Sequence, residues 1–454
     1  MKKRIALYVI AFLALLSGAV TAWLRFSHVT IEEPRNIAFN EHNLDIKEIK
    51  IPSIDEPIWF VKTKNPTVAV LVCFKNEGAR SFNDKPGLLP LVSSLLSQGA
   101  GPYNATELAQ IWDANRIEIS ANFNSDDWSV SLYCVPEKFQ LAMDLFREGA
   151  LNAHLPEEKI EMFKREMKEN IHQNRVYPES IAGEAMMKLM YTPDHPYFVT
   201  DGDVLSNIDK YTRNDLVKAY NKLFDPRDAY VIVAGNISED EVKETFEKLF
   251  ISLKKQNPNT FKSVEQDTKL FKEGEIIHLK YDAPQTIIAF RHPGIKRNAP
   301  ERFAFIMANE ILGRGVKSRL FTELREKLGL VYAVDSSTVM LDMISVVAGS
   351  TATEPKNRDV LISKIKEIFQ SLAEKGVTQE ELDFHKVSLA VSEDLSSASN
   401  IVSFLNLCKR MNIPFSKVNR YSHNFYDLAL EEVNSVIKKS FDPNKLNFVT
   451  IGAA

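Results

Sequence analysis

Histidine spacing is the most direct sign of a zinc-dependent hydrolase, because two imidazoles on one helix face can bind the metal. The chain has nine histidines, and none has a second histidine three or four residues away. The Gly-x-Ser-x-Gly elbow of serine hydrolases and a glycine-rich phosphate loop ending in lysine are also missing. The sequence therefore contains no complete motif for zinc-dependent hydrolysis, serine hydrolysis or phosphate binding.

Composition limits the classes of function that remain. The chain has 454 residues, of which 44% are apolar and 26% charged, so it can bury a large core and is long enough for more than one domain. Its formal net charge is −4. A chain without a basic excess has no field that attracts phosphates, so we expect no nucleic-acid partner. Peptides or another protein fit this composition better.

The N-terminus has the layout of an export signal. Lys2, Lys3 and Arg4 precede an uncharged run over residues 5–24. Val20-Thr21-Ala22 offers small residues to a signal peptidase, and the run is also long enough to span a bilayer uncleaved. Residues 1–28 are therefore predicted to be a signal peptide or an N-terminal membrane anchor, with the rest of the chain in the periplasm.

Three cysteines, Cys73, Cys134 and Cys408, form an odd set. Two of them lie in apolar, strand-like runs, and no Cys-x-x-Cys pair indicates redox or metal chemistry. We expect buried free thiols. An oxidising compartment would also permit a disulfide, which the sequence alone does not pair.

The sequence repeats itself, which indicates two homologous halves. Phe224-Asp225-Pro226 leads into an apolar run ending at Gly235, and Phe441-Asp442-Pro443 leads into one ending at Gly452. The spacing from phenylalanine to glycine is the same in both. Upstream, Pro66 followed by Val68 to Phe74 resembles Pro284 followed by Ile287 to Phe290.

Each half has the pattern of an α+β domain, with strands in a sheet covered by helices. In the first half, residues 128–135 alternate as a strand should, whereas residues 136–153 and 156–176 have helical apolar spacing. Residues 253–273 are polar and lack a sustained apolar face, so we place a linker there. The predicted domains are residues 29–252 and 274–454.

This duplicated layout, and the phrases within it, resemble the pitrilysin or insulinase-like family of zinc metallopeptidases, whose bacterial branch is close to mitochondrial processing peptidase. The resemblance covers nearly everything after the export segment. It implies two homologous domains, each a mostly antiparallel sheet covered by helices, which together form half of a clamshell chamber.

The family's zinc motif, His-x-x-Glu-His, is degenerate in this chain. The matching stretch runs from Gly87 to Ala100, and Pro90, Ser93 and Ser94 occupy the three functional positions. Proline has no side-chain donor, and a serine hydroxyl is a poor zinc ligand that cannot replace glutamate as the general base. The resemblance therefore implies a domain without zinc and without catalysis of its own.

The family's third ligand is a glutamate on a later helix, and alignment on Tyr177-Pro178 puts Asn170 at that position. A register shift of a turn or less would nominate Glu166 or Glu169 instead. One carboxylate alone would not hold zinc. His172 lies nearby, and a lone helical histidine is more often a surface or packing residue than a ligand.

The second half retains the segment that contacts substrate in active relatives. It reads Gly315-Val316-Lys317-Ser318-Arg319-Leu320-Phe321, then Leu324-Arg325-Glu326, then Gly329-Leu330-Val331-Tyr332. By resemblance, Arg325 and Tyr332 bind substrate and stabilise the negative charge that hydrolysis places on the carbonyl oxygen. In the structural alternative, Arg325 pairs with Glu326, Glu323 or another acid on a helix surface, and Tyr332 is a strand residue with its ring in the core.

These expectations define a division of labour. The chain would be the non-catalytic subunit of a hetero-oligomeric zinc metalloendopeptidase, and a homologous partner subunit would hold the zinc. The ligand would be a peptide or an unfolded protein. The alternative is a peptide-binding or envelope scaffold, descended from a peptidase, with no role in proteolysis. A hydrolase with different chemistry is a third reading, although its nucleophile and base are not recognisable.

Overall fold

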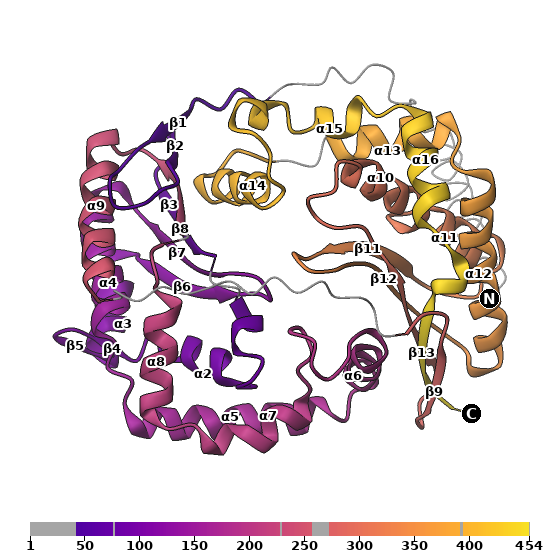
Figure 1. Ribbon diagram of the computed structural model, residues 1–454, viewed down its shortest axis with the longest axis horizontal. Helices are drawn as coiled ribbons and strands as arrows, with labels where there is room; N and C mark the ends of the chain where they lie inside the picture. The colour runs from indigo at the N-terminus through magenta and orange to yellow at the C-terminus, as the bar shows by residue number, and fades with distance from the viewer. Residues whose placement is uncertain (1–41, 76–77, 228, 257–271, 391–393, 454) are drawn as a thin grey trace, which may run out of the picture. The chain divides into compact units, whose positions relative to one another are not determined.

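The computed structural model describes residues 42–75, 78–227, 229–256, 272–390 and 394–453 (Figure 1). The predicted export segment, residues 1–28, lies outside these ranges. Within the described ranges, no helix combines the length and the apolar character needed to cross a bilayer.

The first sheet has six strands in the order β1-β2-β8-β3-β7-β6. Only β2 and β8 run parallel, and the other neighbours are antiparallel. The strands are β1 (Ile46–Ile49), β2 (Ile58–Lys62), β3 (Val68–Phe74), β6 (Glu118–Phe123), β7 (Trp128–Cys134) and β8 (Ala229–Gly235). A separate two-stranded sheet joins β4 (Gly99–Ala100) to β5 (Tyr103–Asn104).

The second sheet repeats this arrangement with five strands in the order β9-β13-β10-β12-β11. Its single parallel pair, β9 and β13, stands where β2 and β8 stand in the first sheet. The strands are β9 (Ile276–Lys280), β10 (Thr286–Pro293), β11 (Val334–Met340), β12 (Ser345–Thr353) and β13 (Asn447–Gly452). The two Phe-Asp-Pro phrases thus precede equivalent strands, β8 and β13, as the repeat predicts.

Helices make up most of the remaining described chain. Before the second sheet these are α2 (Leu88–Ser94), α3 (Ala105–Asn115), α4 (Phe139–Asn152), α5 (Glu157–Asn174), α6 (Pro178–Met190), α7 (Asp201–Asn207), α8 (Arg213–Leu223) and α9 (Glu239–Gln256). Within and after it they are α10 (Arg302–Gly313), α11 (Arg319–Phe321), α12 (Arg358–Lys375), α13 (Gln379–Ala390), α14 (Ala398–Arg410), α15 (His423–Tyr426) and α16 (Leu430–Ser440). The chain is therefore an α+β protein, as predicted.

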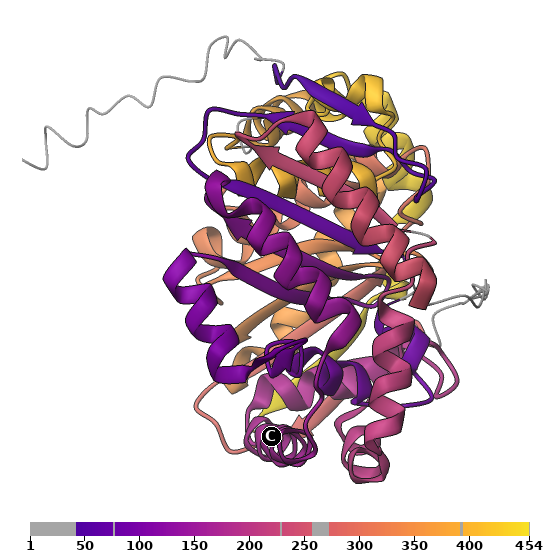
Figure 2. The same ribbon diagram turned by 90° about the vertical axis from the view of Figure 1, so that its left-hand side faces the viewer.

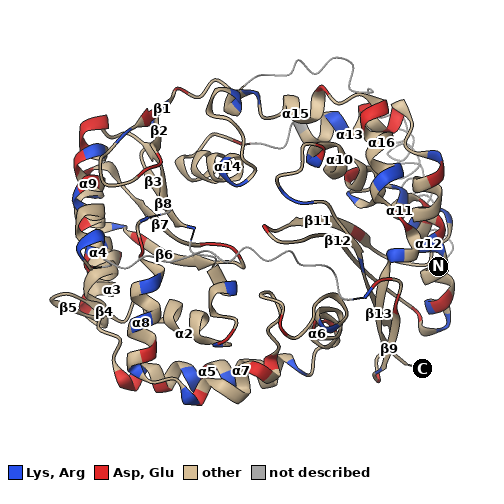
Figure 3. Cartoon of the chain, viewed as in Figure 1, with Lys and Arg blue, Asp and Glu red and all other residues tan. Residues whose placement is uncertain are grey.

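Each sheet is covered by helices from both parts of the chain. Helices α4 and α9 lie across one face of the first sheet (Figure 1, Figure 2), while α14 packs against β3 and β8 on the other. In return, α6 packs against β10 and β13 of the second sheet. Lys and Arg alternate with Asp and Glu along α5, α9 and α12, as expected for solvated helix faces (Figure 3).

The predicted linker overlaps a helix at its start. Helix α9 continues to Gln256, and Leu253 is fully buried within it. The polar composition of residues 253–273 concealed this last turn, in which a single leucine reaches the core. Residues 257–271 of the predicted linker lie outside the described residues, and the domain boundaries stay a prediction.

The three cysteines are buried and form no disulfide, which confirms the expectation of buried thiols. Burial raises the pKa of both the Cys73 and the Cys134 thiol to about 12. Because the thiolate is the reactive form, these thiols are inert while the protein is folded.

We therefore expect no reaction with Ellman's reagent at pH 8 in the folded state, and three equivalents after unfolding in guanidinium chloride. Reaction of one or more equivalents in the folded protein would contradict the burial of these thiols.

Gly349 in β12 lies directly opposite Phe290 in β10. A Cβ at Gly349 would lie 2.6 Å from Phe290 Cε1, and Phe290 is fully buried against Phe369 and Phe448. We expect Gly349→Ala to lower the free energy of unfolding by about 1–3 kcal/mol, because the ring has no space to retreat.

Urea denaturation measures this effect, with Gly183→Ala as the control. No atom lies within 4 Å of a Cβ at Gly183, which is an exposed position of α6. There alanine is expected to stabilise the helix by about 0.5–1 kcal/mol. Equal effects of the two substitutions would refute the packing argument.

Candidate functional site

Helix α2 carries the degenerate zinc positions, and packing fixes where it starts. Its N-cap, Gly87, has φ 85°, a left-handed conformation that favours glycine. A Cβ there would lie 2.8 Å from Val204 Cγ1. Leu88, Leu89 and Leu91 are buried in the core of the first sheet. The family's glycine and apolar positions are thus retained for structural reasons.

The side chains at the three ligand positions are accommodated within helix α2 itself. Pro90 is the third residue of α2, where the backbone nitrogen needs no intrahelical acceptor. The Ser93 hydroxyl donates to the Leu89 carbonyl at 2.9 Å, and the Ser94 hydroxyl donates to the Pro90 carbonyl at 3.0 Å. These substitutions therefore leave α2 intact without a ligand or a general base.

Helix α5 packs beside α2. Asn170 lies on it at an exposed position, and Glu166, Glu169 and His172 are exposed as well. Across the described residues, no group of three histidine, cysteine, aspartate or glutamate side chains is placed to hold a metal ion. The donors present at Pro90, Ser93, Ser94 and Asn170 do not fit zinc, so we derive no catalytic step through it.

Arg325 and Tyr332 are brought together by the structure. Arg325 lies in a π-helical turn, Thr322–Lys327, a distortion that often occurs at functional sites. Its guanidinium carbon is 4.7 Å from the ring centre of Tyr332 and 4.9 Å from that of Phe321. Two aromatic rings therefore hold the cation, an arrangement that stabilises it by about 0.5–1 kcal/mol per exposed contact.

The structural alternative for this pair is wrong. The ring of Tyr332 is 81% exposed and does not lie in the core. Within the described chain Arg325 forms no ion pair, because Glu323 bonds to Lys327 instead. The guanidinium and the phenol are thus accessible and adjacent, which allows both to donate hydrogen bonds to one carbonyl oxygen of a bound peptide.

Arg319 supports this segment, a role that sequence reasoning missed. Its Nε and Nη2 donate to the two carboxylate oxygens of Glu381 at 2.7 and 2.8 Å, and Nη2 also donates to the Gly376 carbonyl at 2.7 Å. Ser318 caps α11 through a bond from the Phe321 N–H. A bidentate pair is the strongest geometry available to arginine, so it fixes α11 against the start of α13.

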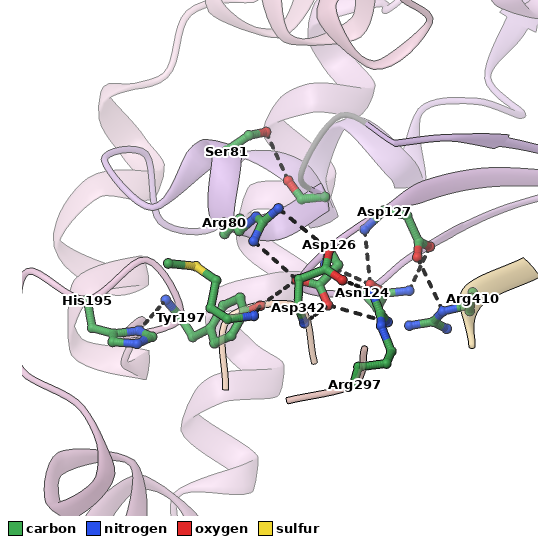
Figure 4. A network of polar contacts seen from close by, with 12 residues as sticks. Arg80, Ser81, Asn124, Asp126, Asp127, His195, Tyr197, Arg297, Asp342 and Arg410 are labelled. Atoms are coloured by element: carbon green, nitrogen blue, oxygen red, sulfur yellow. Dashed lines mark hydrogen bonds and ion pairs between the residues drawn. The ribbon is translucent and has the colours of Figure 1, made fainter. Parts of the chain in front are cut away.

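A second polar cluster, which sequence reasoning missed, joins the two sheets (Figure 4). Asp126, in the turn between β6 and β7, has a side chain that is 1% exposed. It accepts bonds from the Tyr197 hydroxyl and, at 3.0 Å, from the backbone N–H of Asp342 in the turn between β11 and β12. The turns of two equivalent hairpins therefore meet at one carboxylate.

Two guanidinium groups compensate the buried carboxylate. Arg80 lies 3.6 Å and Arg297 lies 3.8 Å from Asp126, and both also pair with Asp342. Burial, followed by the hydrogen bond to Asp126, raises the pKa of Tyr197. Tyr197 therefore stays protonated and serves as a donor. The Tyr197 hydroxyl also accepts from the Met343 N–H at 3.3 Å.

No hydrogen bond or ion pair joins α2, Arg325 and the Asp126 cluster within the described residues. The site thus consists of two parts on different elements: the helix pair α2 and α5, and the pair formed by the half-buried Arg325 and the exposed Tyr332. A duplicated α+β fold with this combination resembles a peptidase whose usual zinc positions hold Pro90, Ser93, Ser94 and Asn170.

Comparisons with known proteins find zinc proteases and their inactive homologues. Residues 210–389 match the family model described as the peptidase M16 inactive domain. The chain is 25% identical over 395 residues to an uncharacterized zinc protease of Mycobacterium leprae, covering 84% of this chain and 85% of the relative. It is 22% identical over 415 residues to the non-peptidase homolog YmxG of Helicobacter pylori, covering 90% and 93%.

Solved structures share the fold. A peptidase M16 inactive domain from Pseudomonas fluorescens aligns with a TM-score of 0.83 at 23% identity, covering 90% of this chain and 98% of that one. A protease from Helicobacter pylori aligns with a TM-score of 0.78 at 19% identity, covering 90% and 99%. The chain therefore resembles peptidase M16 proteins, the pitrilysin and insulinase-like group, in the sequence of residues 210–389 and in its fold.

The Asp126 cluster makes a testable prediction about stability. Asp126→Asn keeps the shape of the side chain but removes the buried one of the two carboxylates that Arg80 and Arg297 share, the other being the more exposed Asp342. We expect the free energy of unfolding to fall by about 3–5 kcal/mol, the usual cost of breaking a buried ion pair.

Asp209→Asn is the matched control for chemical denaturation. It removes a carboxylate that is 63% exposed and lies 2.8 Å from Lys168, for which about 0–1 kcal/mol is expected. A loss at Asp126 no larger than that at Asp209 would refute the structural importance of the cluster.

Proposed function

We propose that this chain is the non-catalytic subunit of a hetero-oligomeric zinc metalloendopeptidase. In this proposal it is exported to the periplasm, where it binds and positions a peptide for a homologous partner that carries His-x-x-Glu-His. Zinc belongs to the partner. The two homologous domains, residues 29–252 and 274–454, form half of a clamshell chamber around the substrate, which is a peptide or an unfolded protein.

One observation carries the proposal. The ring of Tyr332 stays exposed and in contact with the half-buried Arg325, although α2 has a proline and two serines at the zinc positions. A donor pair of this kind stabilises the charge on a scissile carbonyl only if a metal and a base act on the same bond. A second subunit supplies both in the proposed complex.

The alternative is a peptide-binding or envelope scaffold that takes no part in proteolysis. It is favoured by the relative whose name describes a non-peptidase homolog. Both readings predict a chain without zinc when it is purified alone. They differ in whether a zinc-bearing homologue binds this chain and needs it for turnover.

The test is to purify the chain alone and after co-expression with a homologue that has an intact zinc motif. Zinc content and peptidase activity are measured in both preparations. We expect neither in the chain alone and both in the complex. Stoichiometric zinc or hydrolysis by the chain alone would overturn the proposal, and a failure to form any complex would favour the scaffold.

Substitutions then test the donated residues within the complex. Arg325→Ala and Tyr332→Phe are expected to lower kcat by about 10²–10³-fold, the effect of removing a transition-state donor, without preventing assembly. Arg314→Ala, which removes an exposed arginine just before the same segment, is the control with unchanged kcat. Equal activity of all three variants would refute the donated site.

A further inference from the structure

The outer edge of the second sheet differs from that of the first. In the first sheet, β1 pairs with β2 and covers its outer edge. Strand β9 occupies the equivalent place in the second sheet, parallel to β13, and no described strand pairs with its outer edge. The second sheet therefore ends at β9, whose outer edge is unpaired among the described residues, whereas the first sheet has an additional strand, β1, at that place.

Alternate residues of β9 present their backbone groups to this open edge. The Glu275 carbonyl accepts from the Phe448 N–H at 2.8 Å, and the Tyr281 N–H donates to the Gly452 carbonyl at 2.8 Å, so the odd-numbered residues bond to β13. The outward-facing N–H and C=O groups belong to Ile276, His278 and Lys280. Within the described chain, no backbone hydrogen bond to these outward-facing groups is formed from a turn, a loop or another element. An edge with unpaired groups of this kind is a template for another strand.

A groove of about 490 Å³ lies beside this edge, between β9 and α6. Ile181 and Ala185 line it from α6, and Ile277 and Leu279 line it from β9. The charged groups around it are two of each sign: Arg175, Lys188, Glu184 and Asp201. Balanced charge around an apolar lining favours an uncharged side chain in the groove.

Exposed apolar side chains continue the surface beyond the groove. Val176 and Tyr177 are 60% and 56% exposed in the connection between α5 and α6. The Tyr281 hydroxyl donates to the Val176 carbonyl at 2.6 Å, which places this connection next to the end of β9. Ile276, at the other end of the strand, is 48% exposed. Exposed apolar groups therefore lie near both ends of the open edge, with Ile276 on the face of the sheet opposite to Ile277 and Leu279.

We propose that the open edge of β9 and its groove bind an extended peptide segment, which adds to the second sheet as a further strand. The segment bonds to the outward backbone groups of β9 and places an uncharged apolar side chain in the groove at every second position. The proposal rests on the proposed function for its class of ligand, a peptide. It adds a docking site on elements other than those of Arg325 and Tyr332.

The test uses the purified full chain without a partner, so it does not depend on zinc or on turnover. The probe is a fluorescein-labelled peptide of about ten residues that alternates valine and threonine between terminal lysines, and binding is measured by fluorescence anisotropy. We expect saturable binding to the chain. No binding would overturn the proposal and leave the zinc-partner proposal untouched.

Two substitutions at one position isolate the backbone contribution. His278→Pro removes an N–H that the sheet does not use, and proline is tolerated at such an edge. It is expected to weaken binding by about fivefold to tenfold or more. His278→Ala keeps the N–H, while both variants lose the 2.9 Å contact from His278 Nδ1 to Thr450 Oγ1. Binding within about twofold of wild type is expected for alanine, and equal affinity of the two variants would overturn the proposal.

Ile181→Lys tests the groove, and self-association tests the occupant. The substitution places a charge in the apolar lining and is expected to weaken binding, with circular dichroism confirming the fold. Sedimentation velocity reports whether wild type dimerises. A dimer that His278→Pro converts to a monomer would show that the edge serves a second copy of the chain, and would overturn the peptide assignment.

Discussion

The central strands of the first sheet are covered on both faces, and the rest of the fold depends on this constraint. Every residue of β3 and β8 is buried, so these strands need an apolar layer on each side. Helices α4 and α9 provide one layer from nearby sequence. The other layer is α14, which follows the second sheet's hairpins in the chain. Helix α6 packs on the second sheet in return, so neither sheet is complete without the other part of the chain.

Apolar burial of this kind fixes which elements meet, whereas the Asp126 cluster fixes how they meet. Hydrophobic contact is not directional, and a sheet packed only by apolar side chains can slide. A carboxylate that accepts a bond from the backbone of the opposite hairpin turn permits one relative position of the two turns. Three arginines pair with three aspartates there. Arg80 pairs with Asp126, Arg297 with Asp342, and Arg410 with Asp127. The cluster buries charges without burying an excess of either sign.

Local patterns made most of the fold predictable from the sequence. The strand at residues 128–135 and the helices at 136–153 and 156–176 agree with β7, α4 and α5, because apolar periodicity is a local signal. The absence of the zinc ligands was also predictable, because the residues of the zinc motif are close together in the sequence. The Asp126 cluster was not predictable, because its members come from distant turns. The polar last turn of α9 misled the linker prediction, as one buried leucine carries too little periodic signal.

The arginine–tyrosine pair and the zinc positions are energetically independent, which explains how one can persist without the other. Arg325 is held by two rings, and its segment is fixed by the bidentate pair of Arg319 with Glu381. None of these groups lies on α2 or α5. On α2, the serine hydroxyls bond to carbonyls of their own helix, so the loss of zinc ligands leaves no buried polar group unpaired. A chain can therefore lose the metal at no cost to the geometry of its donor pair, and this independence makes a division of catalysis between two subunits physically feasible.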